Sequence, residues 1–168
     1  MMAMAHPKLA LRPYLPEDAA MLREIFRDSI ADLTDEDYTP AQQEAWASAA
    51  DDEKAFGNKL AGELTLVATL AGSPVGFAAL EGKDKIDMLY VHPAAVGQGV
   101  GAMLVDALEK LAGSRGAAKL IVDASDSARG FFENRGYVAQ QRNTVSVGDE
   151  WLANTTLHKP LAAKREAS

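Results

Sequence analysis

The 168-residue sequence predicts an α/β fold of the α+β type, with a mixed sheet of about seven strands. Three observations indicate this class. Helical spacing of apolar residues dominates 16–60, two short β-rich runs follow within 64–80, and a strand–helix–strand pattern occupies 85–124. Helices before a hairpin, followed by a strand–helix–strand unit, imply a sheet with both antiparallel and parallel neighbours.

The N-terminal third begins with a strand at 9–12 and continues with helices. The first helix starts near Pro16, and its inward stripe should comprise Leu22, Ile25, Phe26, Ser29, Ile30 and Leu33. Thr39 should cap the next helix, because its side chain and that of Gln42 suit a capping box. A short third helix is predicted at about 51–60.

A hairpin and a glycine-rich turn form the middle of the chain. Strands at 64–70 and 74–80 are joined by residues 71–73, and a further strand at 85–91 leads into the turn. Gly97, Gly99 and Gly101 stand on alternate positions, just before a helix whose predicted apolar face is Val100, Met103, Leu104, Ala107, Leu108 and Leu111. Such a turn presents free backbone N–H groups at the positive end of a helix dipole, where a phosphate binds. The spacing fits neither the dinucleotide-binding fingerprint nor the ATP-binding P-loop.

The C-terminal part predicts another strand, a helix and a final pair of strands. Residues 118–124 form an apolar run suited to a buried strand. Ser125 should cap the helix that follows, and Gly136 suits the position after its C-terminus. The last two strands are predicted at about 138–146 and 151–159.

Composition limits the possible functions. We expect one domain at 9–161, with an N-terminal extension at 1–8 and a flexible tail at 162–168. The net charge of −7 without a basic stripe gives little support to nucleic-acid binding, and no apolar run is long enough to span a membrane. The absence of cysteine fits a cytoplasmic location, and the three scattered histidines predict no metal site.

The glycine turn and the last helix resemble motifs A and B of the GCN5-related N-acetyltransferase (GNAT) family. Motif A is usually Arg/Gln-x-x-Gly-x-Gly/Ala, which is similar to residues 96–101, and the preceding Val-His-Pro is also common there. Motif B is usually Ala-x-x-Phe-Tyr-x-x-x-Gly-Phe, which is similar to residues 128–137. The resemblance covers about residues 9–160, and the segments 38–46 and 151–155 look like one bacterial branch of uncharacterised members. It implies a mixed, mostly antiparallel central sheet of about seven strands with helices on both faces, in which two central strands splay apart to admit the cofactor.

This resemblance implies acetyl-CoA as the acetyl donor. The pyrophosphate would lie on the backbone N–H groups of the glycine turn, and the pantetheine arm would pair with the strand at 85–91. The implied cofactor contacts are Leu89, Tyr90, Val91, Val96, Gly97, Gln98, Gly99, Val100, Gly101, Ala102, Ser125 and Phe131.

The chain departs from the family pattern at four positions. Val96 replaces the usual Arg or Gln, and Ser125 replaces an asparagine that many relatives use to bind the cofactor arm. Phe132 stands where many relatives have a tyrosine that protonates the leaving thiolate, while Tyr137 should pack in the core. Lys85 stands where relatives often have the general base.

Asp87 is the best candidate for the general base. Two residues before Leu89, it should project to the same face of its strand. A solvated carboxylate without catalytic function is the alternative, and His92, which has a suitable pKa, is a second candidate.

The implied reaction is direct attack by a primary amine of a small molecule on acetyl-CoA in a ternary complex. Tyr38, Trp46 and Trp151 are candidate walls of the acceptor pocket, although each also suits a structural role. We expect a monomer or homodimer without nucleic-acid or membrane partners. The alternative is a catalytically silent CoA-binding module or sensor, which the substitutions at Phe132, Val96 and Lys85 favour.

Overall fold

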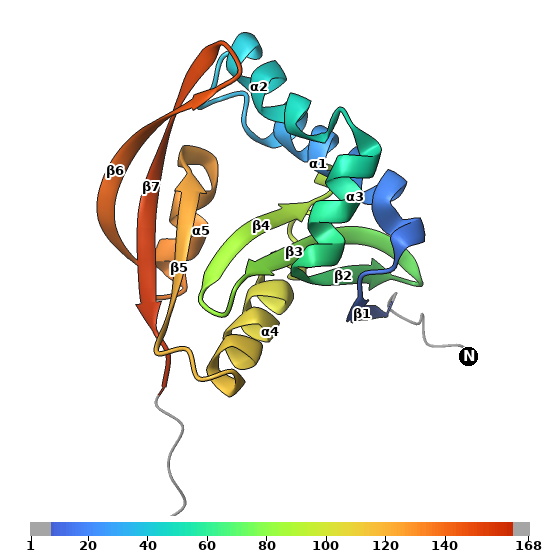
Figure 1. Ribbon diagram of the computed structural model, residues 1–168, viewed down its shortest axis with the longest axis vertical. Coiled ribbons are helices and arrows are strands. Elements are labelled where there is room, and N and C mark those ends of the chain that lie inside the picture. Colours follow the sequence, from blue (N-terminus) through green and yellow to red (C-terminus); the bar gives the residue numbers. More distant parts are fainter. Residues whose placement is uncertain (1–7, 163–168) are drawn as a thin grey trace, which may run out of the picture.

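The computed structural model describes residues 8–162, which form one seven-stranded sheet with five α-helices (Figure 1). The strands are β1 (Leu9–Pro13), β2 (Leu64–Leu70), β3 (Ser73–Glu81), β4 (Lys85–Val91), β5 (Lys119–Ser125), β6 (Val138–Val147) and β7 (Glu150–Pro160). The helices are α1 (Ala19–Leu33), α2 (Pro40–Ala47), α3 (Glu53–Gly62), α4 (Val100–Ser114) and α5 (Asp126–Asn134). The predicted fold class and order of elements are confirmed. Except for Lys8 and Ala162, the predicted N-terminal extension and C-terminal tail lie outside the described residues.

The sheet is divided at its centre. Its order is β1-β2-β3-β4-β5-β7-β6, and all neighbours are antiparallel except β4 and β5. These two strands pair only near the start of β4, at Lys85 with Ile121 and at Ile86 with Val122. Beyond that point they diverge, as Figure 1 shows. The predicted splay is confirmed, and it leaves the C-terminal part of β4 with a free edge in the middle of the sheet.

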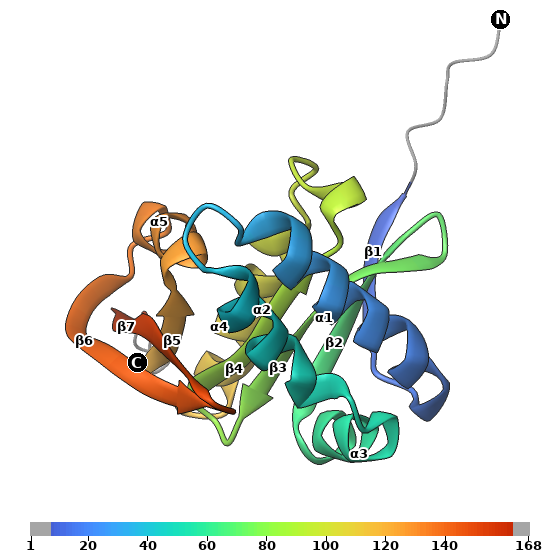
Figure 2. The same ribbon diagram turned by 90° about the horizontal axis from the view of Figure 1, so that it is seen from above.

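Two hydrophobic cores hold the helices on opposite faces of the sheet (Figure 2). On one face, α1 and α3 bury Leu22, Ile25, Phe56 and Leu60 against Val67 and Phe77. On the other face, α4 and α5 bury Leu104, Leu108 and Phe132 with Leu120 and Leu157. Among the described residues, no helix is both long and apolar enough to span a membrane.

The helix ends follow the sequence closely. The capping box of α2 is present: Thr39 Oγ1 accepts a hydrogen bond from the Gln42 N–H at 3.2 Å, and Gln42 Oε1 accepts one from the Thr39 N–H at 2.9 Å. The predicted inward stripe of α1 is buried except at Leu33, which lies at the helix end, is 39% exposed and lines a cavity described below. The face of α4 is wider than predicted and includes buried Val105 and Ala112, because α4 contacts strands on both sides of the splay.

Gly76 allows the start of α4 to lie close to the sheet. A Cβ at Gly76 would lie 2.9 Å from Val100 Cγ1 and 3.0 Å from the Tyr90 carbonyl oxygen. We therefore expect Gly76→Ala to lower the free energy of unfolding by about 1–3 kcal/mol, as overpacking usually does. Gly113→Ala in α4 is the control, since its Cβ meets nothing within 4 Å and alanine favours a helix by up to about 1 kcal/mol. Urea unfolding measures both, and equal effects would contradict the explanation.

Candidate active site

A cavity of about 340 Å³ lies at the splay. Residues 86–91 of β4 line one side and residues 122–125 of β5 line the other, with contributions from α1, α2, α4 and α5. The charged side chains among its lining residues are two carboxylates, Asp87 and Asp123. The divided sheet therefore provides a cavity with a free strand edge along its wall.

The backbone of Leu89 and Val91 faces this cavity. The His92 N–H donates a hydrogen bond to the Val75 carbonyl of β3 at 2.8 Å. In an antiparallel pair, every second residue directs its N–H and C=O groups toward the same neighbouring strand, and the residues in between direct theirs away from it. His92 is one of the residues that face β3. The peptide groups of Leu89 and Val91 thus point away from β3, toward the space that β5 leaves open. A ligand with an amide-bearing arm can pair with them as a strand would.

A β-bulge interrupts β4 beside the cavity. Leu80 of β3 pairs with Ile86, and its neighbour Ala79 pairs with Met88, so Asp87 is an extra residue of β4. Such a residue breaks the strict alternation of side chains between the two faces of the sheet. A prediction that assigns residues to the two faces of the sheet by strict alternation therefore fails across Asp87.

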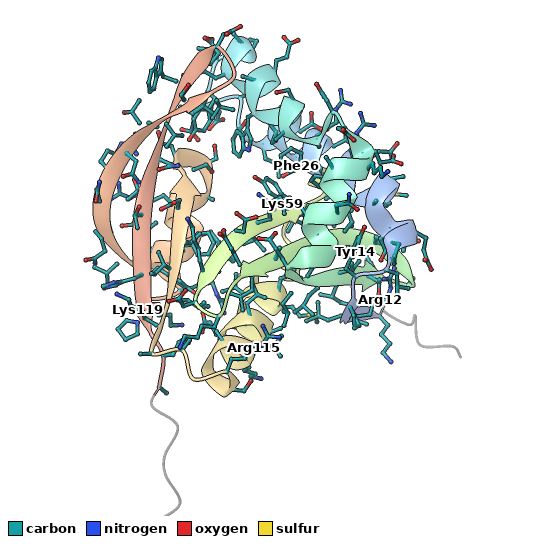
Figure 3. The ribbon with its side chains drawn as sticks, viewed as in Figure 1. Arg12, Tyr14, Phe26, Lys59, Arg115 and Lys119 are labelled. Atoms are coloured by element: carbon teal, nitrogen blue, oxygen red, sulfur yellow. The ribbon has the colours of Figure 1, made fainter. Side chains whose placement is uncertain are left out.

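The bulge directs Asp87 toward α3. Its Oδ2 lies 3.2 Å from the Nζ of Lys59, which extends from α3 toward β4 (Figure 3), and its side chain is 17% exposed. Leu89 packs in the other core, on the α4 face. The prediction that Asp87 and Leu89 share a face is therefore wrong. Asp87 nevertheless lines the cavity and remains the candidate base.

The glycine turn places the start of α4 at the cavity. Gly97 and Gly99 have φ of +86° and +82°, a conformation that favours glycine. Gly99 is the N-cap of α4 and provides no side-chain cap, so the amides of the first turn are available to an anionic ligand. A Cβ on Gly101 would lie 3.3 Å from the ring of Phe131, which shows how closely α4 and α5 approach here.

The predicted cofactor contacts fall into two groups. Those that line the cavity are Leu89, Tyr90, Val91, Val96, Gly101, Ser125 and Phe131. Those that lie in the turn or at the start of α4, outside the cavity lining, are Gly97, Gln98, Gly99, Val100 and Ala102. The Val96 side chain is 52% exposed, and its N–H already donates to the Pro93 carbonyl at 3.4 Å. Its amide is therefore less free than those at the start of α4.

Ser125 has a structural task in addition to any contact with a ligand. Its Oγ accepts a hydrogen bond from the Ala128 N–H at 3.1 Å, which confirms the predicted cap of α5. The hydroxyl proton is not used in this bond. Ser125 can therefore cap the helix and donate to a ligand in the cavity at the same time.

The aromatic residues of α5 bring no hydroxyl to the cavity. Phe131 lines it, whereas Phe132 is 2% exposed and packs edge-on against Tyr137. Tyr137 is buried and donates to Glu109 Oε2 at 3.0 Å, so its predicted place in the core is confirmed. Within residues 128–137, which the structure describes in full, no hydroxyl lines the cavity.

Hydroxyl groups reach the cavity from residues that sequence analysis did not assign to it. Ser29 and Thr34 come from the end of α1, and Ser127 from α5. Ser29 had a visible signal, because it is the polar member of an otherwise apolar helical stripe. Tyr90, predicted as a cofactor contact, also accepts a hydrogen bond through its own hydroxyl from Trp46 Nε1 at 3.2 Å. Burial raises the pKa of Tyr90 well above its ordinary value, so this phenol stays neutral.

Of the three predicted acceptor walls, only Trp46 lines the cavity. Trp151 is 64% exposed and is absent from the lining. Tyr38 is 6% exposed, and its hydroxyl donates to the Ala153 carbonyl at 2.6 Å and accepts from the Asp126 N–H at 2.9 Å. Tyr38 thus links β7 to the start of α5 rather than forming a free wall.

The other candidate groups near β4 are already engaged. Lys85 Nζ lies 3.3 Å from Asp123 Oδ2 across the start of the splay. The Nε2 atom of His92 lies 3.2 Å from Asp28, and its Nδ1 accepts from the Ala94 N–H at 3.1 Å. His92 is not among the residues that line the cavity, and the site therefore offers less support to it than to Asp87 as a base.

Comparison with known proteins identifies close relatives. The family model described as "Acetyltransferase (GNAT) domain" matches residues 34–153. The uncharacterized N-acetyltransferase YafP of Escherichia coli K12 is 33% identical over 146 residues, covering 87% of this chain and 92% of YafP. A crystal structure of a GCN5-related N-acetyltransferase from Rhodopseudomonas palustris is 65% identical, with a TM-score of 0.90 over 96% of this chain and 99% of the other. The PaiA N-acetyltransferase of Thermoplasma acidophilum, solved with coenzyme A, shares the fold at 17% identity, with a TM-score of 0.76 over 91% of this chain and 99% of PaiA.

The Tyr38 hydroxyl predicts a measurable contribution to stability. Tyr38→Phe leaves the Ala153 carbonyl and the Asp126 N–H without this partner, which should lower the free energy of unfolding by about 1–3 kcal/mol. Trp151→Ala is the control, because surface substitutions usually stay within about 0.5 kcal/mol. Denaturant unfolding compares the two variants. A larger loss for Trp151→Ala would show that the assignment of their roles is reversed.

Proposed function

Because the chain belongs to the GCN5-related N-acetyltransferase (GNAT) family, we propose that it acetylates the primary amine of a small molecule by direct attack within a ternary complex. The family resemblance of the two motifs is confirmed, and the chain is an acetyl-CoA-dependent N-acetyltransferase. The observation that carries the proposal is the cavity at the splay, which is lined by a free strand edge, the start of α4 and Asp87. This arrangement suits a long anionic cofactor on one side and an amine on the other.

The start of α4 and the free edge of β4 are assigned to acetyl-CoA. The pyrophosphate would bind the free amides after Gly99, where the helix dipole favours negative charge. The pantetheine arm would pair with the peptide groups of Leu89 and Val91, and Phe131 and Ser125 would contact it from α5 and the end of β5. The thioester would then lie within the cavity, beside Tyr90 and Val91.

The rest of the cavity is assigned to the acceptor. The whole cavity measures about 340 Å³ and the pantetheine arm takes part of it, so the space that remains suits a small molecule better than a folded protein segment. The two charged lining residues, Asp87 and Asp123, are both acidic, and the lysines that pair with them do not line the cavity, so its wall presents carboxylates to an amine that arrives as a cation. Trp46 and Tyr90 provide aromatic surface for the apolar part of such a molecule.

Asp87 is assigned to deprotonation of the amine. The ammonium group loses one proton to Asp87, and the neutral nitrogen then attacks the thioester carbonyl carbon. The C–N bond forms, the C–S bond breaks, and the second nitrogen proton ends on the CoA thiol. Proton transfer by a positioned carboxylate usually contributes about 10²–10⁴-fold to the rate.

Family membership favours an active transferase over the catalytically silent module. A cytoplasmic location, a bacterial origin and a monomeric or homodimeric state stay predictions.

The cheapest test of the cofactor is thermal stabilisation, because a ligand of the folded state raises stability by roughly RT ln(1 + [L]/Kd). Acetyl-CoA should stabilise the protein, whereas NAD and ATP should not. No shift with any CoA ester would refute the cofactor assignment.

Gly101→Glu tests the position of the pyrophosphate. The new side chain places bulk and negative charge where the anion approaches, and affinity for acetyl-CoA should fall by roughly 2 kcal/mol or more. Gly101→Gln adds similar bulk without charge and should lose less. Isothermal titration calorimetry measures both, after unfolding has shown how much each variant loses through contact with Phe131. Unchanged affinity in both variants would place the pyrophosphate elsewhere.

Asp87→Asn tests the general base. The substitution keeps size and polarity, so acetyl-CoA should still bind, while turnover of an accepted amine should fall by roughly 10²-fold or more. The pH–rate profile should also lose its acidic limb. Thiol release from acetyl-CoA during a screen of amines provides the assay. Normal turnover by this variant would assign the base to another group or to water.

A further inference from the structure

Asp87 does not stand alone at the bulge of β4. Glu63 at the C-terminus of α3, Glu81 at the end of β3 and Asp87 bring carboxylate oxygens within 4.8 Å of one another. Lys59, one turn before Glu63 on α3, is the cation among these four groups, and its ammonium pairs with Asp87 at 3.2 Å. Three carboxylates thus share one lysine, and Lys59 itself is 56% exposed.

Two of the carboxylate oxygens are enclosed without an ordinary hydrogen bond. Glu63 Oε1 and Asp87 Oδ2 are buried atoms that accept no hydrogen bond from any described group, although Oδ2 has the ion pair with Lys59. If both carboxylates are ionised in this position, their negative charges repel each other and lack solvation. A proton held between the two groups removes the repulsion and gives the remaining carboxylate a hydrogen bond.

The two groups also face different spaces. Asp87 lines the cavity at the splay, whereas Glu63 lines a separate cavity of about 470 Å³ bordered by Tyr14 and Leu60. A proton that moves from Asp87 to Glu63 therefore leaves the proposed active site without crossing the space that acetyl-CoA and the amine occupy.

We propose that Asp87 and Glu63 act as one base: the two carboxyl groups share a proton, and the proton that Asp87 removes from the acceptor passes to Glu63. The inference rests on the proposed role of Asp87. In the reaction, the fully ionised pair accepts one proton from the ammonium group, holds it as the shared proton and later releases it to solvent from Glu63; the pair that already holds this proton cannot act as the base. Glu63 is thus a positioning residue, because it receives the proton only through Asp87 and does not touch the substrate.

The charges around Glu63 support this assignment. Burial, followed by the charge of Asp87 and by the hydrogen bond that a protonated Glu63 donates to it, raises the pKa of Glu63 to about 7, while Lys59 opposes the rise and Glu81 adds to it. These are the charged groups that face Glu63 from α3, β3 and β4. A pair that titrates near neutrality suits a base that works near neutral pH.

The first experiment needs no acceptor. Carboxyl ¹³C NMR titration of the full chain should show one glutamate signal with a midpoint near pH 7, absent in Glu63→Gln and moved toward lower pH in Asp87→Asn. A Glu63 midpoint at the ordinary glutamate value would overturn the inference. So would a midpoint that moves when EDTA or Mg²⁺ is added, because a cation would then hold the cluster.

Thermal unfolding gives a second readout of the same pair. The pKa of Glu63 is raised in the folded state, so its contribution to stability is complete below its unfolded pKa and is lost as pH rises toward and through 7. The melting temperature of Glu63→Gln should therefore increase relative to the unmodified protein between about pH 5 and pH 8. A constant difference across this range contradicts the shared proton.

The kinetic experiment uses an accepted amine. Glu63→Gln removes the carboxylate that receives the proton from Asp87, so the acidic limb that the pair sets near pH 7 should move to lower pH and maximal kcat should fall roughly 10-fold. The KM for acetyl-CoA should not change. Glu63→Asp should restore much of the profile, and Glu81→Gln, which removes an exposed charge of the same cluster, should shift it less.

The outcomes separate the two proposals. Turnover with an unchanged acidic limb in Glu63→Gln overturns the pair and leaves the proposed function intact. Failure of every amine to react refutes the proposed function, whereas the NMR and unfolding experiments still decide whether Asp87 and Glu63 share a proton.

Discussion

The constraint on which the structure depends is the short pairing of β4 with β5. A sheet that paired these strands along their whole length would have no cavity, because backbone hydrogen bonds would occupy the edge of β4. Pairing ends after Ile86 and Val122, and the peptide groups of Leu89 and Val91 are left facing an open space. Unpaired backbone groups inside a protein are costly unless a ligand or water satisfies them. The unpaired groups at the splay are therefore costly without a ligand and available to bind one. Gly76 and Gly101 allow α4 and α5 to approach this edge closely.

A second irregularity places charge beside this edge. The bulge adds Asp87 to β4 without a partner on β3 and directs its carboxylate toward Lys59 and Glu63. One extra residue thus places the Asp87 side chain on the α3 face of the sheet, beside the charged groups of α3, and not on the face that alternation predicts. The two irregularities are neighbours in sequence, so one short strand provides both a backbone edge for a cofactor and a carboxylate for the proposed proton transfer.

Much of the fold and part of the site could be predicted from sequence. Caps such as Thr39 and Ser125, and glycines with positive φ such as Gly99, act over a few residues, and local rules describe them well. The face of Asp87 could not be predicted, because a bulge depends on the register of β3 against β4 and not on the sequence of β4 alone. The roles of Tyr38 and Glu63 could not be predicted either, because their partners lie far along the chain. Tyr38 contacts β7 and α5, and Glu63 faces Asp87 of β4.

The departures from the family motifs acquire a physical meaning in this arrangement. The Val96 side chain lies largely in solvent, and Phe132 lies in the core behind Phe131, so neither substitution removes a peptide group from the edge of β4 or from the start of α4. A site built on backbone amides tolerates side-chain changes that would disable a site built on side chains. Proton transfer is different, because it needs a titratable group in contact with the substrate. In the proposed enzyme, Asp87 and its neighbours meet this requirement. The bulge of β4 and the end of α3 position the carboxylates between which the proton moves.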